Sequence, residues 1–146
     1  MTTTRWPSAA AKRPPVGDVV AGLAGDESTA AVARAAVREA VARGARVRFL
    51  QVLREGMTPE QRAALDESIF TAALRALREA PRLPVTFEVV DGDPADTFVR
   101  RSEGASVLVV AHNTADADGA VAAYCQRHAR CDVLTVHPDV REHAAG

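Results

Sequence analysis

The stretch GAVAAYCQRHARCDVLTV, residues 119–136, carries more information about the fold than any other part of this chain. Its first part is typical of a short helix that ends in Arg127-His128-Ala129. A two-residue corner follows, and the apolar run from Val133 to Val136 is typical of a buried strand. The stretch therefore predicts a helix that leads directly into a strand.

The chain upstream repeats this unit. Short apolar runs bounded by glycine, proline or aspartate predict strands, and small apolar residues that recur every three or four positions predict helices between them. The predicted strands are 16–23, 46–53, 85–90, 106–111 and 132–136, and helices are predicted to begin near Asp26, Thr58, Asp93 and Gly119. This alternation predicts one doubly wound α/β domain, a parallel sheet with helices on both faces and right-handed crossovers.

The helix after Thr58 has the clearest local signals. Thr58-Pro59-Glu60-Gln61 is a capping box with proline at the first helical position. The residues predicted to form its buried stripe are Leu65, Ile69, Ala72, Ala73, Ala76 and Leu77.

Composition sets limits on function. The 146 residues are 47% hydrophobic and 25% charged, with a net charge of −1, which predicts a globular chain without affinity for nucleic acid or anionic membranes. No apolar run is long enough to span a bilayer, and the N-terminus lacks the apolar segment of a secretory signal, so we expect a cytoplasmic protein. The expected organisation is a flexible arm (1–15), a domain (16–138) and a tail (139–146). The single lysine, Lys12, lies in the arm, which argues against a Walker lysine or a Schiff base.

The chain resembles the universal stress protein family from about residue 16 to 136. The end of the family pattern, G-S-V-x-x-x-x-x-R-H-A-P-C-P-V-L-V-V, matches residues 119–136, and weaker matches are AVARGARV (40–47), GDPA (92–95) and GASVLVV (104–110). The resemblance implies a five-stranded parallel sheet of order 3-2-1-4-5, Rossmann-like and similar to the adenine nucleotide alpha hydrolases.

With that strand order, ligands bind beyond the carboxyl ends of the strands where the order reverses, between the loops after strands one and four. The candidate site is a crevice formed by Leu23, Ala24, Gly25, Asp26, Ala111, His112, Gly119 and Ala120. The resemblance implies an ATP site here, with an aspartate where this chain has Ala24. Asp26, two residues on, substitutes only if the turn is remodelled, and it can instead cap the following helix.

The phosphate-binding loop that the resemblance implies is also altered. Its first glycine corresponds to Ala111, and its final glycine with a hydroxyl residue corresponds to Gly119-Ala120. The segment between them is too short and contains no glycine. It carries Asp116 and Asp118, which would repel a triphosphate unless a divalent cation intervened. We therefore expect a vestigial nucleotide crevice with no cofactor; the alternative is ATP or AMP, with magnesium, in a rearranged loop, with possible slow hydrolysis.

Other chemical groups give weaker indications. His112, Asn113, Asp116 and Asp118 can form a metal or acid–base site with His137, which should lie one strand away at about 5 Å, but their spacing matches no metal signature, and loop and capping roles explain these residues too. We assign neither a metal site nor catalytic residues. His128 is expected to stabilise the end of its helix, and Cys125 and Cys131 are expected to be small buried thiols.

The last strand, Asp132–Val136, should lie at a sheet edge, and an uncovered edge invites pairing. The resemblance implies an antiparallel homodimer through this strand; the alternative is that the tail, 138–146, covers it. The sequence thus predicts a dimeric binding or regulatory module, with an unidentified protein partner, rather than an enzyme.

Overall fold

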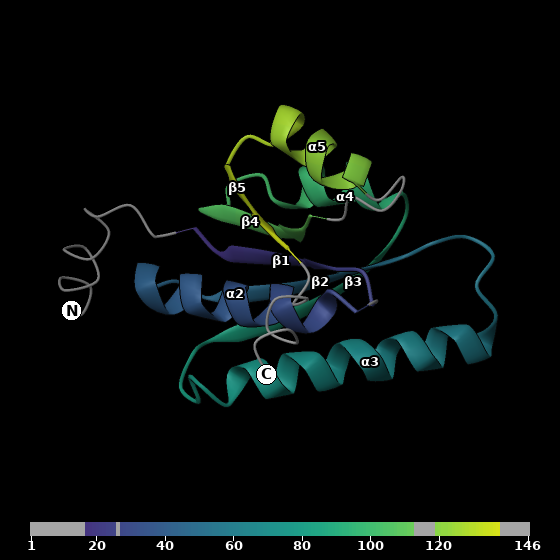
Figure 1. Cartoon of the computed structure of the whole chain (residues 1–146), viewed down its shortest axis with the longest axis horizontal. Coiled ribbons are helices and arrows are strands. Elements are labelled where there is room, and N and C mark those ends of the chain that lie inside the picture. Colours follow the sequence, from purple (N-terminus) through teal and green to yellow (C-terminus); the bar gives the residue numbers. More distant parts are fainter. Residues whose placement is uncertain (1–16, 26, 113–118, 138–146) are drawn as a thin grey trace, which may run out of the picture.

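The computed structural model describes residues 17–25, 27–112 and 119–137, and these form a five-stranded, entirely parallel sheet (Figure 1). The strand order is β3-β2-β1-β4-β5, which confirms the predicted order. The strands are β1 (Val19–Leu23), β2 (Val47–Leu53), β3 (Val85–Asp91), β4 (Val107–Ala111) and β5 (Asp132–Val136). The order reverses between β1 and β4, because β1 pairs with both β2 and β4.

Four helices connect the strands: α2 (Thr29–Arg43), α3 (Pro59–Leu77), α4 (Pro94–Arg101) and α5 (Gly119–His128). Helices α2 and α3 lie on one face of the sheet, and α4 and α5 lie on the other (Figure 1). The predicted doubly wound α/β fold is therefore confirmed. No helix among the residues the structure describes has the length and apolar character needed to cross a membrane.

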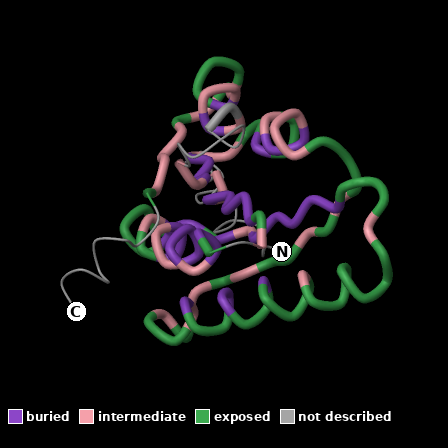
Figure 2. Tube along the Cα trace, turned by 45° about the vertical axis from the view of Figure 1, so that its right-hand side comes forward, coloured by how far each residue is buried: buried purple, intermediate pink, exposed green. Residues whose placement is uncertain are grey.

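The sheet is buried on both faces, which explains why its strands are almost continuously apolar. Along β1, Val19, Ala21 and Leu23 pack towards α2 and α3, whereas Val20 packs towards α4 and α5. Figure 2 shows buried residues along the inner strands and on the inner sides of the helices. The apolar surface removed from water on both faces is the main source of stability.

The predicted capping signals are present. The Gln61 N–H donates to the Thr58 hydroxyl at 3.0 Å, and the Thr58 N–H donates to the Gln61 side-chain oxygen at 2.9 Å. At the start of α4, the Asp93 carboxylate accepts from the Asp96 N–H at 3.1 Å. The predicted stripe of α3 faces the sheet, with Ile69, Ala72, Ala73 and Ala76 buried and Leu65 and Leu77 half-buried.

Several boundaries differ from the sequence prediction. Strand β1 begins at Val19 rather than at residue 16. The Val19 N–H donates to the Arg46 carbonyl at this first position. Helix α2 begins at Thr29, and Ser28 occupies the position before it. Asp26, which was expected to cap this helix, lies outside the described residues, as do the predicted arm (1–15) and tail (139–146).

Candidate functional site

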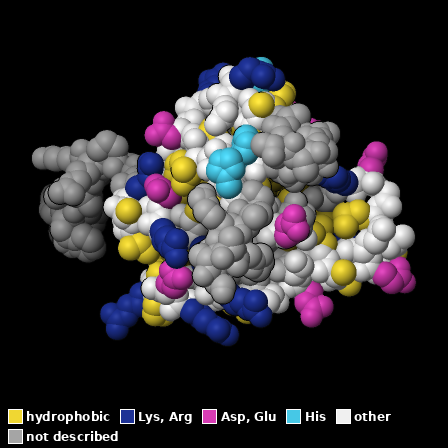
Figure 3. Space-filling view, in the orientation of Figure 1, with side chains coloured by type: hydrophobic (Ala, Val, Ile, Leu, Met, Phe, Trp, Pro, Cys, Tyr) yellow, Lys and Arg dark blue, Asp and Glu magenta, His cyan; other side chains and the backbone are white. Residues whose placement is uncertain are grey.

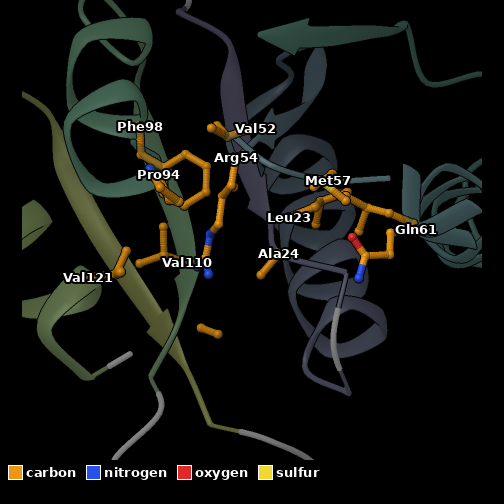
Figure 4. Close-up of a pocket in the computed structure, with 13 residues that line it drawn as sticks. Leu23, Ala24, Val52, Arg54, Met57, Gln61, Pro94, Phe98, Val110 and Val121 are labelled. Carbon is orange, nitrogen blue, oxygen red and sulfur yellow. The ribbon is translucent and has the colours of Figure 1, made fainter. Parts of the chain in front are cut away.

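A cavity of about 530 Å³ opens beyond the carboxyl ends of β1, β2 and β4, where the strand order reverses (Figure 4). Ligands of open parallel sheets bind at this position because the loops on either side diverge there. Residues from three strands, three helices and the loops after β1 and β2 line the cavity: Gly22, Leu23, Ala24, Val52, Arg54, Met57, Gln61, Leu65, Pro94, Phe98, Val110, Ala111 and Val121.

Some of the residues proposed from the sequence lie in this cavity. Leu23 and Ala24 at the end of β1 and Ala111 at the end of β4 line it, on opposite walls. Gly25 and His112 are the next residues along the chain and are not part of the lining. Among the other candidates, Asp26 lies outside the described residues, and Gly119 and Ala120 are described only as the first residues of α5.

Two glycines shape the walls. A Cβ atom on Gly22 would lie 2.9 Å from the ring of Phe98, so the bare backbone of β1 lets this ring pack directly against the sheet. Gly25 has a φ of +83°, and a Cβ atom there would collide with the Leu65 side chain. The Gly25 turn therefore allows α3 to close one side of the cavity.

Two parts of the lining were not predicted from the sequence: the residues of α4 and α5, and the wall that β2 and α3 provide. Arg54 directly follows β2, Met57 lies in the loop after it, and Gln61 lies in the first turn of α3. A signal was present, because the carboxyl ends of parallel strands meet at one edge of the sheet, so residues after the second strand also reach the crevice. The predicted crevice comprises only the loops after the first and fourth strands.

The lining contains few polar groups. Gln61 uses its side-chain oxygen to accept from the Thr58 N–H, and its amide nitrogen has no hydrogen bond to a described residue. Among the described residues, Arg54 is the only charged side chain in the lining of this cavity, and it has no ion pair or hydrogen bond with them. No carboxylate borders the cavity in the part of the chain described. Its surface is thus mainly hydrocarbon with one cation.

His112 and His137 are neighbours, as predicted from the strand spacing. Their ring centroids lie 4.6 Å apart with an edge-on geometry, and the His112 N–H donates to the Val136 carbonyl at 2.7 Å. The loop residues 113–118, which supply the predicted carboxylates, lie outside the described residues. The described residues contain no group of three or more His, Cys, Asp or Glu side chains placed to bind a metal ion.

The cysteines lie behind the cavity, in the same apolar cluster as Phe98. Cys125 of α5 is buried, whereas Cys131 is half-buried, and both are free thiols. Burial, with a smaller contribution from Cys131, raises the pKa of the Cys125 thiol from 9.0 to about 12. Cys125 is therefore protonated near neutral pH and a poor nucleophile. His128, the last residue of α5, stacks against Tyr124 at 4.3 Å.

Charged side chains of both signs are interspersed on the face shown in Figure 3. No broad region of one sign covers the described part of that face. This mixture agrees with the net charge of −1.

Comparison with known proteins identifies relatives of this fold. The family model described as the universal stress protein family matches residues 16–137. A universal stress protein in complex with cAMP has 22% identity and a TM-score of 0.69, and the match covers 84% of this chain and 97% of that one.

Two further solved structures are similar. The universal stress protein from Archaeoglobus fulgidus in complex with dAMP has 21% identity and a TM-score of 0.66, over 82% of this chain and 96% of its own. A universal stress protein family member from Burkholderia pseudomallei has 27% identity and a TM-score of 0.60, over 84% and 96%. The comparison with curated proteins finds no match. Because the family model matches most of this chain, the chain belongs to the universal stress protein family.

Proposed function

We propose that this protein is a binding or regulatory module of the universal stress protein type whose crevice does not hold ATP in the family manner. The observation that carries the proposal is Ala24, which lines the cavity where the family resemblance implies an aspartate. The methyl group of Ala24 cannot accept hydrogen bonds from a nucleotide. No carboxylate of the described chain borders the cavity to replace the missing aspartate.

The sequence of the loop between β4 and α5 supports the same proposal. It lacks the glycines that let backbone N–H groups approach phosphates, and the final hydroxyl residue is replaced by Ala120. Asp116 and Asp118 would add negative charge beside a triphosphate. Changes in three separate elements of an ATP site therefore all argue against ATP binding in the family manner.

The test is ATP binding to the purified protein, measured by thermal unfolding with and without magnesium. A ligand at a hundredfold excess over its dissociation constant stabilises the folded state by about 2.7 kcal/mol, which raises the melting temperature by several degrees. We expect no shift with micromolar ATP. A clear upward shift, or ATP released on denaturation of the purified protein, would overturn the proposal.

A matched variant separates the loss of the carboxylate at Ala24 from the changes in the loop. Ala24→Asp restores the carboxylate without restoring the loop, so we expect ATP still to leave the melting temperature unchanged. If this single change produces a shift, the loop is competent and only Ala24 prevents binding.

A second candidate function is binding of AMP or ATP through a rearranged loop, with possible slow hydrolysis. The observation in its favour is that solved relatives are described as complexes with cAMP, dAMP and AMP. Chromatography of the supernatant after denaturing the purified protein distinguishes the two: a stoichiometric adenine nucleotide supports this candidate and its absence supports the first.

We also propose that β5 is the interface of a homodimer. This strand pairs with β4 on one side, and the described residues offer no strand to its other side. The Val136 carbonyl accepts from His112 and thus faces β4. Because backbone groups alternate along a strand, the N–H of Thr135 faces the open edge, where a second copy can pair with it.

This geometry makes Thr135→Pro a usable test, because proline removes a donor that β4 does not use. We expect the variant to keep its circular dichroism spectrum and to sediment as a monomer, whereas Thr135→Ala, which retains the donor, stays dimeric. A folded Thr135→Pro dimer would show that the interface lies elsewhere, and a monomeric wild type at micromolar concentration would remove the dimer altogether.

A further inference from the structure

The cavity beyond β1, β2 and β4 is suited in size and surface to a small organic molecule. Its volume of about 530 Å³ lies within the range of roughly 300–1,000 Å³ that is common for small-molecule sites. Hydrocarbon side chains form its walls, with Phe98 and Val110 on one side and Leu23 and Met57 on the other, and Leu65 of α3 is also part of the lining. A ligand that fills it must be largely apolar, because a polar body would lose its hydration without replacement hydrogen bonds.

One cation lies in this apolar space. Figure 4 shows Arg54 extending from the end of β2 into the gap between Val110 and Ala24. Within the described residues no carboxylate pairs with its guanidinium. A guanidinium presents two parallel N–H donors, which match the two oxygens of a carboxylate.

The surroundings limit the ligand to few negative charges. A second hollow of about 620 Å³ shares Arg54, Pro94 and Val121 with the cavity and brings Glu55, Asp91 and Asp93 to its rim. Three carboxylates beside one arginine repel a polyphosphate, whereas a single charge in contact with Arg54 is compensated directly. Because α5 contributes Val121 to the lining, its first turn also borders the cavity, and the positive end of the helix dipole favours an anion there.

We infer that the cavity binds a small carboxylic acid with an apolar body, its carboxylate on Arg54 and its body between Phe98 and Leu65. This inference rests on the proposed function, in which the crevice binds a ligand other than ATP. Arg54 supplies the specificity for the acid, and the apolar walls supply affinity that does not depend on charge.

The experiment uses three probes with one body and three charges: 4-phenylbutanoate, 4-phenylbutanamide and 4-phenylbutylamine. Binding to the full chain is measured by calorimetry or by chemical shifts. Charge-assisted hydrogen bonds to a guanidinium favour the acid, so we expect it to bind at least about tenfold more tightly than the amide and the amine.

Variants assign the effect to the residue. Arg54→Gln should remove the preference for the acid and leave the affinity for the amide unchanged, whereas Arg62→Gln, an exposed arginine of α3 outside the lining, should bind all three probes as the wild type does. Ala24→Trp, a change at an exposed position, should fill the cavity and abolish binding of every probe.

The outcomes separate this inference from the proposed function. Equal affinity for the three probes, or a preference for the acid that survives Arg54→Gln, overturns the assignment of Arg54. If no probe binds and ATP leaves the melting temperature unchanged, the acid ligand is wrong and the proposed function stands. If ATP raises the melting temperature and the acid does not bind, both are overturned.

Discussion

Arg48, near the start of β2, and Arg54, just after its end, lie in contrasting surroundings. The Arg48 guanidinium lies 3.2 Å from the Asp18 carboxylate and 3.5 Å from that of Glu88, and it donates to the Arg101 carbonyl at 2.8 Å. Arg54 has no such partner in the described chain and reaches into a cavity. One end of the sheet thus uses its charges to join strands to α4, whereas the cation at the other end has no partner among the described residues.

The two ends also differ in what holds them together. At the cavity, the walls are positioned by packing on glycine, with Phe98 against Gly22 and Leu65 against Gly25. Because these contacts leave no room for a side chain, the cavity end should be sensitive to added volume. The opposite end should be sensitive to removed charge.

The largest expected effect is at Gly25. Gly25→Ala places a Cβ atom against Leu65 and forces alanine into a φ of +83°. Left-handed backbone costs roughly 1–2 kcal/mol for a residue with a side chain, and overpacking adds about 1–3 kcal/mol, so we expect a loss of about 3 kcal/mol in the free energy of unfolding. Urea denaturation followed by circular dichroism measures it.

Gly44→Ala is the matched control. Gly44 ends α2 with a φ of +65°, and a Cβ atom there has no neighbour within 4 Å among the described atoms. The control carries the backbone strain without the collision and should lose only about 1 kcal/mol. Equal losses in the two variants would show that Leu65 does not press on Gly25.

The next effect tests the charged end. Arg48→Met keeps the apolar stem and removes the guanidinium, so Asp18 and Glu88, both largely shielded from water, lose a partner. We expect a loss of about 2 kcal/mol in the free energy of unfolding at pH 7. Arg46→Met is the control, because Arg46 also faces Asp18 but is more exposed, and its loss should stay below about 0.5 kcal/mol. A loss as small for Arg48 would show that the ion pairs do not hold this end.

The fold was predictable because its signals are local and mutually consistent. The capping box at Thr58 and the stripe from Leu65 to Leu77 defined α3, and alternating strands and helices restrict the topology to few solutions. The strand order itself came from the resemblance carried by residues 119–136, since hydrophobic periodicity does not say which strands are neighbours.

The cavity was predictable in position and only partly in composition. Leu23, Ala24 and Ala111 follow from the rule for parallel sheets, whereas Met57 and Phe98 reach the site through the tilt and length of elements that periodicity does not describe. The ion pairs of Arg48, and the absence of ion pairs between Arg54 and the described residues, could not be predicted either. Both arginines lie in or directly after β2. They differ because residues of β3, of α4 and of the segment before β1 pack around Arg48 and supply its partners.

A smaller effect concerns the apolar cluster behind the cavity. The pKa of Cys125 rises from 9.0 to about 12 on burial, so the unfolded chain releases the thiol proton at lower pH than the folded chain. The stability that results is fully present below pH 9 and is lost as the pH rises towards 12. Between pH 7 and pH 10, the titration of Cys125 should lower the free energy of unfolding by about 1.4 kcal/mol.

Cys125→Ala isolates this contribution. The variant is less stable at every pH because it leaves a small void, but its free energy of unfolding should fall less between pH 7 and pH 10 than that of the wild type. Urea denaturation at the two pH values measures the difference. If wild type and variant lose the same amount, Cys125 does not titrate differently on folding and water reaches the cluster.

The smallest effect completes the contrast between the arginines. Arg54→Met removes a guanidinium that has no partner in the described chain, and its position beside Glu55, Asp91 and Asp93 offers only solvent-screened attraction. The free energy of unfolding should therefore change by less than about 0.5 kcal/mol, the usual range for an exposed substitution. A loss as large as that of Arg48→Met would mean that Arg54 is a structural residue, and its role in ligand binding would have to be abandoned. An unchanged or slightly raised stability would fit a side chain kept for a ligand at a cost to the free protein.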